Sequence, residues 1–224
     1  MRKMRDFFAI GAILLLAHAA WAQPGEVFKE KEYTLTFINQ DPALDPALKQ
    51  RLIKTFFEVY PVLAKAYNNK TLREVTFFVD TTYTGVAEAG GGRVRFSSRW
   101  FHKNPKDIDV VTHEVMHIVQ AYPDEAGPWW VTEGVADYVR YAYGVDNAGG
   151  GWTLPPYKDG QSYENGYRIT ARFLAWIEAH EKKGFVKTLD KSMRSKTYTA
   201  DIWKQQTGKN IDELWKAYSL SPAL

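Results

Sequence analysis

The segment His113-Glu114-Val115-Met116-His117 places two histidines four residues apart, with a glutamate directly after the first. In an α-helix, residues four apart lie on one face, about one turn from each other, so both imidazoles can reach a single metal ion. Glu114 lies about 100° around the helix from His113, within reach of a water on the metal but poorly placed to be a ligand. The pattern predicts a zinc-binding helix with Glu114 as the general base.

The next predicted helix supplies a third ligand. A catalytic zinc ion typically keeps three protein ligands and one exchangeable position. After a loop that contains proline and glycine, residues 129–137 (WWVTEGVAD) have the pattern of a helix start. Glu133 and Asp137 share one face of that helix. We expect Glu133 to complete a site for one Zn²⁺ per chain with His113 and His117, and Asp137 to bind the second ring N–H of a liganding histidine.

Four blocks of sequence carry a resemblance to known families. They are HEVMHIVQ (residues 113–120), WVTEGVADYVRY (130–141), GYRITARFLAW (166–176) and IDELWKAY (211–218). The first two blocks together contain HExxH followed by ExxxD, which resembles the gluzincin metallopeptidases, including the thermolysin type. All four blocks, in this order, more closely resemble the basic secretory protein family of plant and bacterial peptidases. The resemblance implies a zincin-like fold and a peptide or protein substrate.

The remaining patterns predict an α+β fold. Apolar residues alternate or cluster as in strands in three segments, and they have helical spacing in a fourth. The expected strands are residues 32–38, 75–79 and 93–97, and the expected helix is residues 46–67. After residue 128 the sequence predicts helices and loops. We therefore expect a small N-terminal mixed sheet, an active-site helix and a helical C-terminal half.

The strand expected just before the zinc helix has two interpretations. In peptidases of the zincin shape, the last strand before that helix commonly lies along the cleft, where the substrate adds to its exposed edge. Val94, Arg95, Phe96 and Ser97 would then bind the substrate main chain through backbone groups. Alternatively, the segment is an internal strand, and the three preceding glycines only form a turn.

An additional hydrogen-bond donor is expected beside the metal, to stabilise the developing oxyanion of peptide hydrolysis. Related sites use a tyrosine or a histidine for this purpose. Tyr167, in the third family-like block, is the first choice, ahead of Tyr163 and Tyr141. The chain has thirteen tyrosines, so a packing role remains an alternative for each of them.

A loop rich in glycine and proline is expected at residues 147–160 and contains Trp152. Long loops often carry functional residues and move on binding. The loop either borders the active-site cleft or forms a surface connection, and the sequence does not decide between these two interpretations.

The N-terminus has the features of a signal peptide. Arg2, Lys3 and Arg5 form a basic start, an apolar stretch follows, and Ala20-Trp21-Ala22 is an A-x-A cleavage signature. The apolar stretch is too short to span a bilayer comfortably. We expect cleavage after residue 22, export to the periplasm or the medium without stable membrane insertion, and a single zincin-like domain of residues 23–224.

Composition limits the remaining functions. The chain contains no cysteine, which excludes disulfides, thiolate ligands and a cysteine nucleophile. Most of the formal net charge of +3 lies in the predicted signal peptide, and no stripe of basic residues suggests a nucleic-acid partner. A monomer is the expected state.

The sequence thus predicts a secreted zinc metallopeptidase in which Glu114 acts on a zinc-activated water. The alternative is a non-catalytic zincin-fold protein that binds peptide or cell-wall glycan. The presence of Glu114 argues against this alternative, because loss of the base is the simplest route to an inactive relative.

Overall fold

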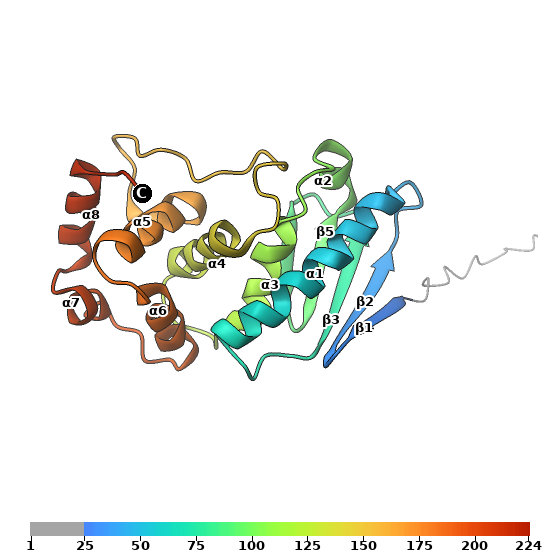
Figure 1. Cartoon of the computed structure of the whole chain (residues 1–224), viewed down its shortest axis with the longest axis horizontal. Coiled ribbons are helices and arrows are strands. Elements are labelled where there is room, and N and C mark those ends of the chain that lie inside the picture. The colour runs from blue at the N-terminus through green and yellow to red at the C-terminus, as the bar shows by residue number, and fades with distance from the viewer. Residues whose placement is uncertain (1–24) are drawn as a thin grey trace, which may run out of the picture.

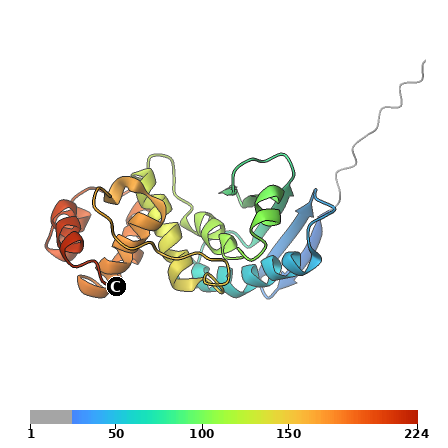
Figure 2. The same cartoon turned by 90° about the horizontal axis from the view of Figure 1, so that it is seen from above.

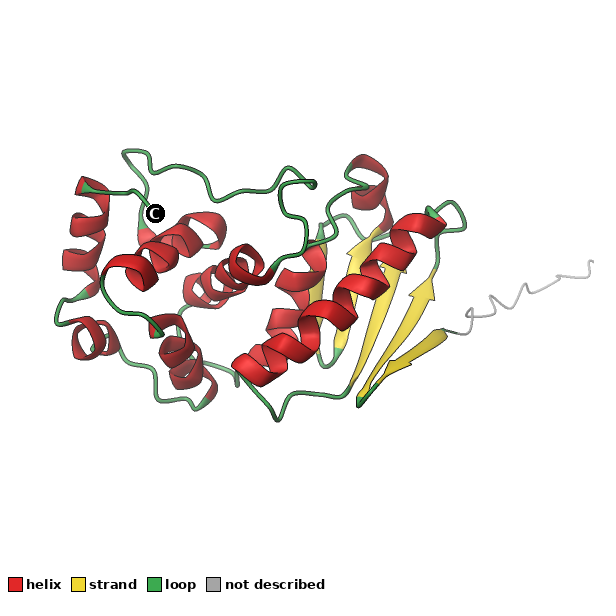
Figure 3. Cartoon of the chain, in the orientation of Figure 1, coloured by secondary structure: helices red, strands yellow, loops and turns green. Residues whose placement is uncertain are grey.

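The computed structural model describes residues 25–224, so the predicted signal peptide of residues 1–22 lies outside the described part of the chain. A five-stranded sheet lies at one end of the molecule and a group of helices at the other (Figure 1, Figure 3). The strands are β1 (Glu26–Glu30), β2 (Tyr33–Asn39), β3 (Glu74–Asp80), β4 (Ala87–Gly90) and β5 (Arg93–Ser97). The helices are α1 (Pro46–Ala66), α2 (Ser98–Lys103), α3 (Val110–Gln120), α4 (Trp129–Tyr143), η1 (Tyr163–Asn165), α5 (Tyr167–His180), α6 (Phe185–Arg194), α7 (Ile202–Thr207) and α8 (Ile211–Leu220).

The sheet is mixed and has one buried face. Its strands lie in the order β1-β2-β3-β5-β4, in which β2, β3 and β5 are parallel, and β1 and β4 are antiparallel to their neighbours. Alternate side chains of the central strands point to the same face. The buried ones are Leu35, Phe37, Val75, Phe77, Val79, Val94 and Phe96. These observations confirm the predicted strands to within two residues, and they confirm the small mixed sheet of the predicted α+β fold.

Helix α1 packs against the buried face of the sheet (Figure 1). It begins after Asp45, whose carboxylate accepts a hydrogen bond from the Ala47 N–H at 2.9 Å. Apolar residues at helical spacing then face the strands. Phe56, for example, lies edge-on to Phe77 of β3, with ring centroids 5.5 Å apart. The helix predicted for residues 46–67 is confirmed.

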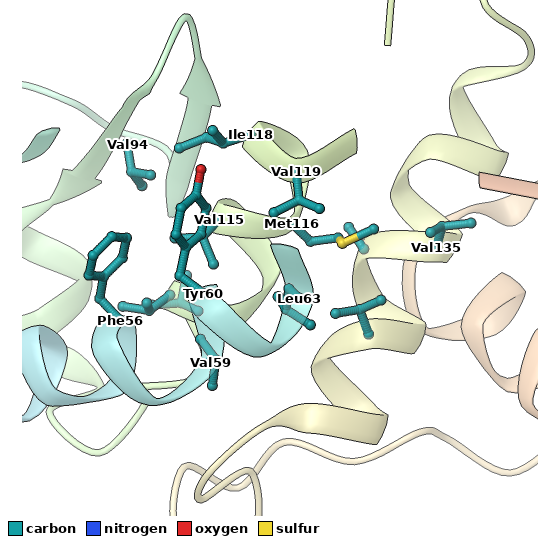
Figure 4. Packing of buried hydrophobic residues seen from close by; sticks show 14 of the residues in the cluster. Phe56, Val59, Tyr60, Leu63, Val94, Val115, Met116, Ile118, Val119 and Val135 are labelled. Carbon is teal, nitrogen blue, oxygen red and sulfur yellow. The ribbon is translucent and has the colours of Figure 1, made fainter. Parts of the chain in front are cut away.

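Helix α3 lies between α1 and α4 and joins the two ends of the molecule through apolar contacts (Figure 4). Val115 and Met116 are fully buried in the shared core. In Figure 4 the Met116 side chain extends from α3 toward α4, which carries Val135. Because both sides of α3 are packed, the side chains on its remaining face are held in fixed positions.

Figure 2 shows the C-terminal helices gathered at the end of the molecule away from the sheet. Their shared core contains a group of large aromatic residues. Trp203 of α7 is fully buried, and its ring lies 5.0 Å from that of Phe185, 6.1 Å from that of Phe173 and 6.0 Å from that of Trp130. Residues 129–224 form helices and loops, as predicted. Within residues 25–224, no helix is both long and apolar enough to cross a membrane.

The expectation that Val94–Ser97 lies at the edge of the sheet is wrong. These residues belong to β5, which is paired on both sides, by β3 and by β4. Gly91 and Gly92 have φ angles of +56° and +80° and form the turn that joins β4 to β5. The edge strand next to β5 is therefore β4, and β1 is the edge strand on the opposite side of the sheet. The Ala-Glu-Ala-Gly sequence of β4 contains no β-branched or aromatic residue, so strand propensity does not identify it.

Candidate metal centre

The two histidines of α3 and the glutamate of α4 lie together. The distances are 3.1 Å from His113 Nε2 to His117 Nε2, 3.3 Å from His113 Nε2 to Glu133 Oε2, and 3.5 Å from His117 Nε2 to Glu133 Oε2. Ligands about 2.0–2.1 Å from a tetrahedral ion are separated by roughly 3.3 Å. The three donor atoms therefore have the spacing that one zinc ion requires, and the predicted ligand set fits the metal.

Each imidazole is oriented by a hydrogen bond at Nδ1, the ring nitrogen that does not face the candidate metal position. His113 Nδ1 lies 2.7 Å from Asp137 Oδ1, and His117 Nδ1 lies 2.7 Å from Gln120 Oε1. Gln120 is itself held by a bond from its Nε2 to the Thr132 carbonyl at 2.9 Å. Because each Nδ1–H donates to an oxygen, each Nε2 lone pair is left for a metal.

Asp137 thus lies where the sequence predicted, but the role of Gln120 was missed. Its position three residues after His117 on the same helix was the available signal, since residues three apart are neighbours on a helix surface. A glutamine indicates a partner of a liganding histidine less specifically than a carboxylate does, because glutamine is also common as an ordinary polar residue.

The electrostatics of the site favour a cation. Burial disfavours the charged form of His113, but the carboxylates of Asp137 and Glu133 outweigh burial and raise its pKa to about 10. Burial likewise opposes ionisation of Glu133, yet His113 and His117 lower its pKa to about 2. A divalent ion would therefore compete with protons for these groups, and its affinity should fall as the pH decreases.

Glu114 is placed as the sequence predicted for a general base. Its side chain lines the same cleft as the three candidate ligands, and the residue is only 6% exposed. Burial raises its pKa, while the neighbouring histidines act in the opposite direction. The carboxylate forms no side-chain hydrogen bond with another residue of 25–224, so its oxygens remain able to accept a proton from a water in the cleft.

Tyr167 also lies at the cleft, and the backbone that places it is unusual. Its ring is nearly parallel to that of His113, with centroids 6.3 Å apart and an interplanar angle of 16°. Tyr167 has a φ of +48°, a region that residues with a side chain rarely adopt. Gly166 has a φ of +73°, and a Cβ on it would lie 2.6 Å from the Trp129 ring. Only glycine therefore fits before Tyr167 in this turn.

The phenol of Tyr167 remains a donor at neutral pH. Burial raises its pKa, and the carboxylates of Glu133, Asp137 and Glu114 raise it further. The other two candidate tyrosines point elsewhere. Tyr163 donates its hydroxyl to Asp212 at 2.9 Å, and Tyr141 is exposed and is not part of the cleft.

The cleft has a volume of about 1180 Å³, and its lining includes residues well outside the candidate ligand set. Strand β4 forms one wall, so the exposed edge of the sheet faces the candidate centre. Gly150, Gly151 and Trp152 also line the cleft. The loop predicted for residues 147–160 therefore borders the cleft, and the alternative of a surface connection away from it does not hold.

Comparison with solved structures shows the same fold at low sequence identity. An M1 zinc metallopeptidase from Deinococcus radiodurans is 12% identical with a TM-score of 0.53, covering 90% of this chain and 51% of that one. Legionella pneumophila aminopeptidase A, in complex with aspartic acid, is 14% identical with a TM-score of 0.58, covering 86% and 27%. An aminopeptidase N family protein from Idiomarina loihiensis is 10% identical with a TM-score of 0.50, covering 86% and 46%. The chain thus spans about half the length of these proteins or less.

Comparison with curated proteins found no match. The family described as peptidase of plants and bacteria matches residues 31–218, and this range contains all four sequence blocks and the candidate metal centre. On this evidence, the chain belongs to the family of peptidases of plants and bacteria.

Proposed function

We propose that the chain is an exported zinc metallopeptidase that hydrolyses peptide bonds in peptide or protein substrates. It is supported above all by the arrangement of His113, His117 and Glu133 at tetrahedral donor spacing, beside the buried carboxylate of Glu114, which forms no side-chain hydrogen bond within residues 25–224. Membership of a peptidase family and the fold shared with zinc metallopeptidases support it.

His113, His117 and Glu133 would hold the ion. When bound, zinc lowers the pKa of a water molecule and polarises the scissile carbonyl. Glu114 then accepts a proton from the attacking water and delivers it to the leaving amine. No covalent intermediate with the protein is needed. Asp137 and Gln120 keep the two imidazoles in the orientation and tautomer that ligation requires.

Tyr167 is the proposed donor to the developing oxyanion. Its ring lies beside His113 at the edge of the metal centre, and its pKa is raised, so the hydroxyl keeps its proton at neutral pH. Residues with unusual backbone angles cluster at functional sites, where the surrounding structure holds them in place. The glycine and the tryptophan that fix this turn therefore support a positioned hydroxyl at this point.

The substrate main chain is proposed to bind along β4 instead of the interior strand of residues 94–97. Ser97 N–H donates to the Val86 carbonyl at 3.0 Å, and bonds to a partner strand involve every second residue of an antiparallel strand. Ala87 and Ala89 therefore direct their N–H and C=O groups away from β5. The Ala87 carbonyl accepts a hydrogen bond from the Tyr83 hydroxyl at 3.3 Å, and the groups of Ala89 face the open edge. An extended peptide can add to this edge as a sixth strand.

Export is proposed from the basic start, apolar stretch and A-x-A signature of residues 1–22, which leave one domain of residues 23–224. Amino-terminal sequencing of the exported protein should find Gln23 as the first residue, whereas an uncleaved N-terminus would contradict the assignment.

Replacement of the base tests the mechanism. Glu114→Gln should lower kcat by roughly 10²- to 10⁴-fold, because the amide cannot accept the proton, and should leave one zinc per chain. Chelation should abolish wild-type cleavage, and added zinc should restore it. Near-normal activity of Glu114→Gln would refute its role. A wild-type protein that binds zinc but cleaves no member of a broad peptide library would favour the non-catalytic binding protein.

Removal of one hydroxyl tests the oxyanion donor. Tyr167→Phe should reduce kcat by about 10²- to 10³-fold with little change in KM, because the bond forms mainly in the transition state. Tyr163→Phe is the matched control, since the Tyr163 hydroxyl bonds to Asp212, and it should leave kcat unchanged. Steady-state kinetics on one peptide would measure both variants. Equal kcat values for Tyr167→Phe and wild type would exclude the role.

The β4 edge is tested by removing one outward N–H. Ala89→Pro should lower kcat/KM by roughly tenfold or more, chiefly through KM, because proline lacks the donor. Zinc content should not change, since no ligand is altered. Ala89→Ser retains the N–H and serves as the control. If both variants cleave peptides like the wild type, main-chain binding at this edge is wrong.

A further inference from the structure

The lining of the cleft includes residues one helical turn away from the candidate metal ligands, and we call this part of the cleft the pocket. On α3, Val110 precedes His113 by three residues, and on α4, Arg140 follows Asp137 by three residues. Both Val110 and Arg140 line the cleft. Three residues of helix rise about 4.5 Å. An extended peptide advances about 3.3 Å per residue, so this pocket lies one or two residues from the bond at the metal.

Two tryptophans form walls of this pocket, and the polar groups around them are already paired. Trp100 donates its indole N–H to Asp107 Oδ2 at 3.0 Å, and Asp107 Oδ1 accepts from the buried guanidinium of Arg140. The same guanidinium lies 4.5 Å from the centre of the Trp152 ring and also bonds to Asn147. The Asp107–Arg140 charges therefore neutralise each other, and the half-buried indole rings remain to contact a ligand.

The backbone closes the end of the pocket. A Cβ on Gly150 would lie 3.2 Å from both the Asp107 Cα and the Lys106 carbonyl oxygen, so the loop that carries Trp152 is packed directly against the loop before α3. Asn147 fixes the start of this loop, because its Nδ2 donates to the Arg140 carbonyl at 2.7 Å. The shape of the pocket is thus fixed by backbone packing and by the hydrogen bonds between Arg140 of α4 and Asn147.

We propose that this pocket, formed by Trp100, Val110, Arg140 and Trp152, determines specificity by binding one large apolar or aromatic side chain of the substrate. The inference rests on the proposed peptidase function and names its substrate class. An apolar side chain gains contact area on the indole rings. A charged side chain would lose hydration there, and neither Asp107 nor Arg140 would be a free partner, because these two already bind each other.

The test begins with a broad peptide library digested by the wild-type protein and read by mass spectrometry. One position, one or two residues from the cleaved bond, should be enriched in phenylalanine, tryptophan, tyrosine or leucine. Two peptides are then compared that differ only there, one with phenylalanine and one with alanine. Trp152→Ala should lower kcat/KM about tenfold or more for the phenylalanine peptide and much less for the alanine peptide.

Control variants distinguish a loss of specificity at the pocket from a general loss of folding or activity. Trp152→Phe should retain most of the preference, because an aromatic ring remains on the wall. Tyr141→Ala removes an exposed aromatic side chain of α4 outside the cleft and should change neither peptide. Zinc content and thermal unfolding should be measured for each variant. Equal losses on both peptides, or a library with no enriched position, would overturn the proposal.

A binding measurement tests the specificity of the pocket even if the protein cleaves no peptide. Zinc-loaded Glu114→Gln should bind the phenylalanine peptide about tenfold more tightly than the alanine peptide in calorimetry, and Trp152→Ala in that background should remove the difference. If the wild type cleaves no peptide but this difference is seen, the peptidase function fails and the pocket stands. If peptides are cleaved but the two affinities are equal, the pocket fails alone.

Discussion

Helix α3 is buried on both sides, and this burial determines where the side chains of the candidate site lie. The helix contacts α1 and the sheet on one side and α4 on the other, and Val115 and Met116 are fully buried there. Removing apolar surface from water fixes the rotation of the helix about its own axis. Once that rotation is set, His113 and His117 have one direction in which to point, toward Glu133 of α4. The hydrophobic core thereby determines the geometry of the candidate metal centre.

Polar side chains next to the two histidines then fix the orientation of the imidazole rings. A histidine ring can rotate about its last bond, so helix position alone does not orient Nε2. Asp137 and Gln120 each bind one Nδ1 and remove that freedom. Within residues 25–224 the Glu114 carboxylate has no such partner, which suits a group that must exchange protons. The two histidines, whose Nδ1 atoms are bonded, are thus the proposed ligands, and Glu114 is the residue proposed for proton transfer.

Features that are local in sequence were predictable. The two histidines and Glu114 occur within five residues, and the Glu133–Asp137 pair repeats the one-turn spacing, so helix periodicity was sufficient. Helix α1 and strands β2 and β3 have clear apolar patterns. The edge strand β4 was not predictable, because its short sequence becomes a strand only through pairing with β5. Strand β1 was not predictable either, because it is largely exposed and has no alternation of buried and exposed residues.

Features that depend on contacts between residues far apart in the sequence could not be predicted either. The sequence left open whether residues 147–160 border the cleft, and the close approach of Gly150 to the loop before α3 decides it. The pairing of Arg140 with Asp107 joins residues 33 positions apart, and no spacing rule indicates it. These contacts form the outer part of the cleft, where selectivity is expected, whereas the local motif forms the part that performs the chemistry.

X-ray absorption at the zinc edge, on protein purified without added metal and calibrated by elemental analysis, would show whether the candidate centre holds zinc. We expect one zinc per chain, bound by two imidazoles and oxygen ligands at about 2.0–2.1 Å. In His113→Ala, loss of the zinc or of one of the two imidazole ligands would assign the site. A protein that contains no stoichiometric zinc, or a zinc ion without imidazole ligands, would refute the proposed metal centre.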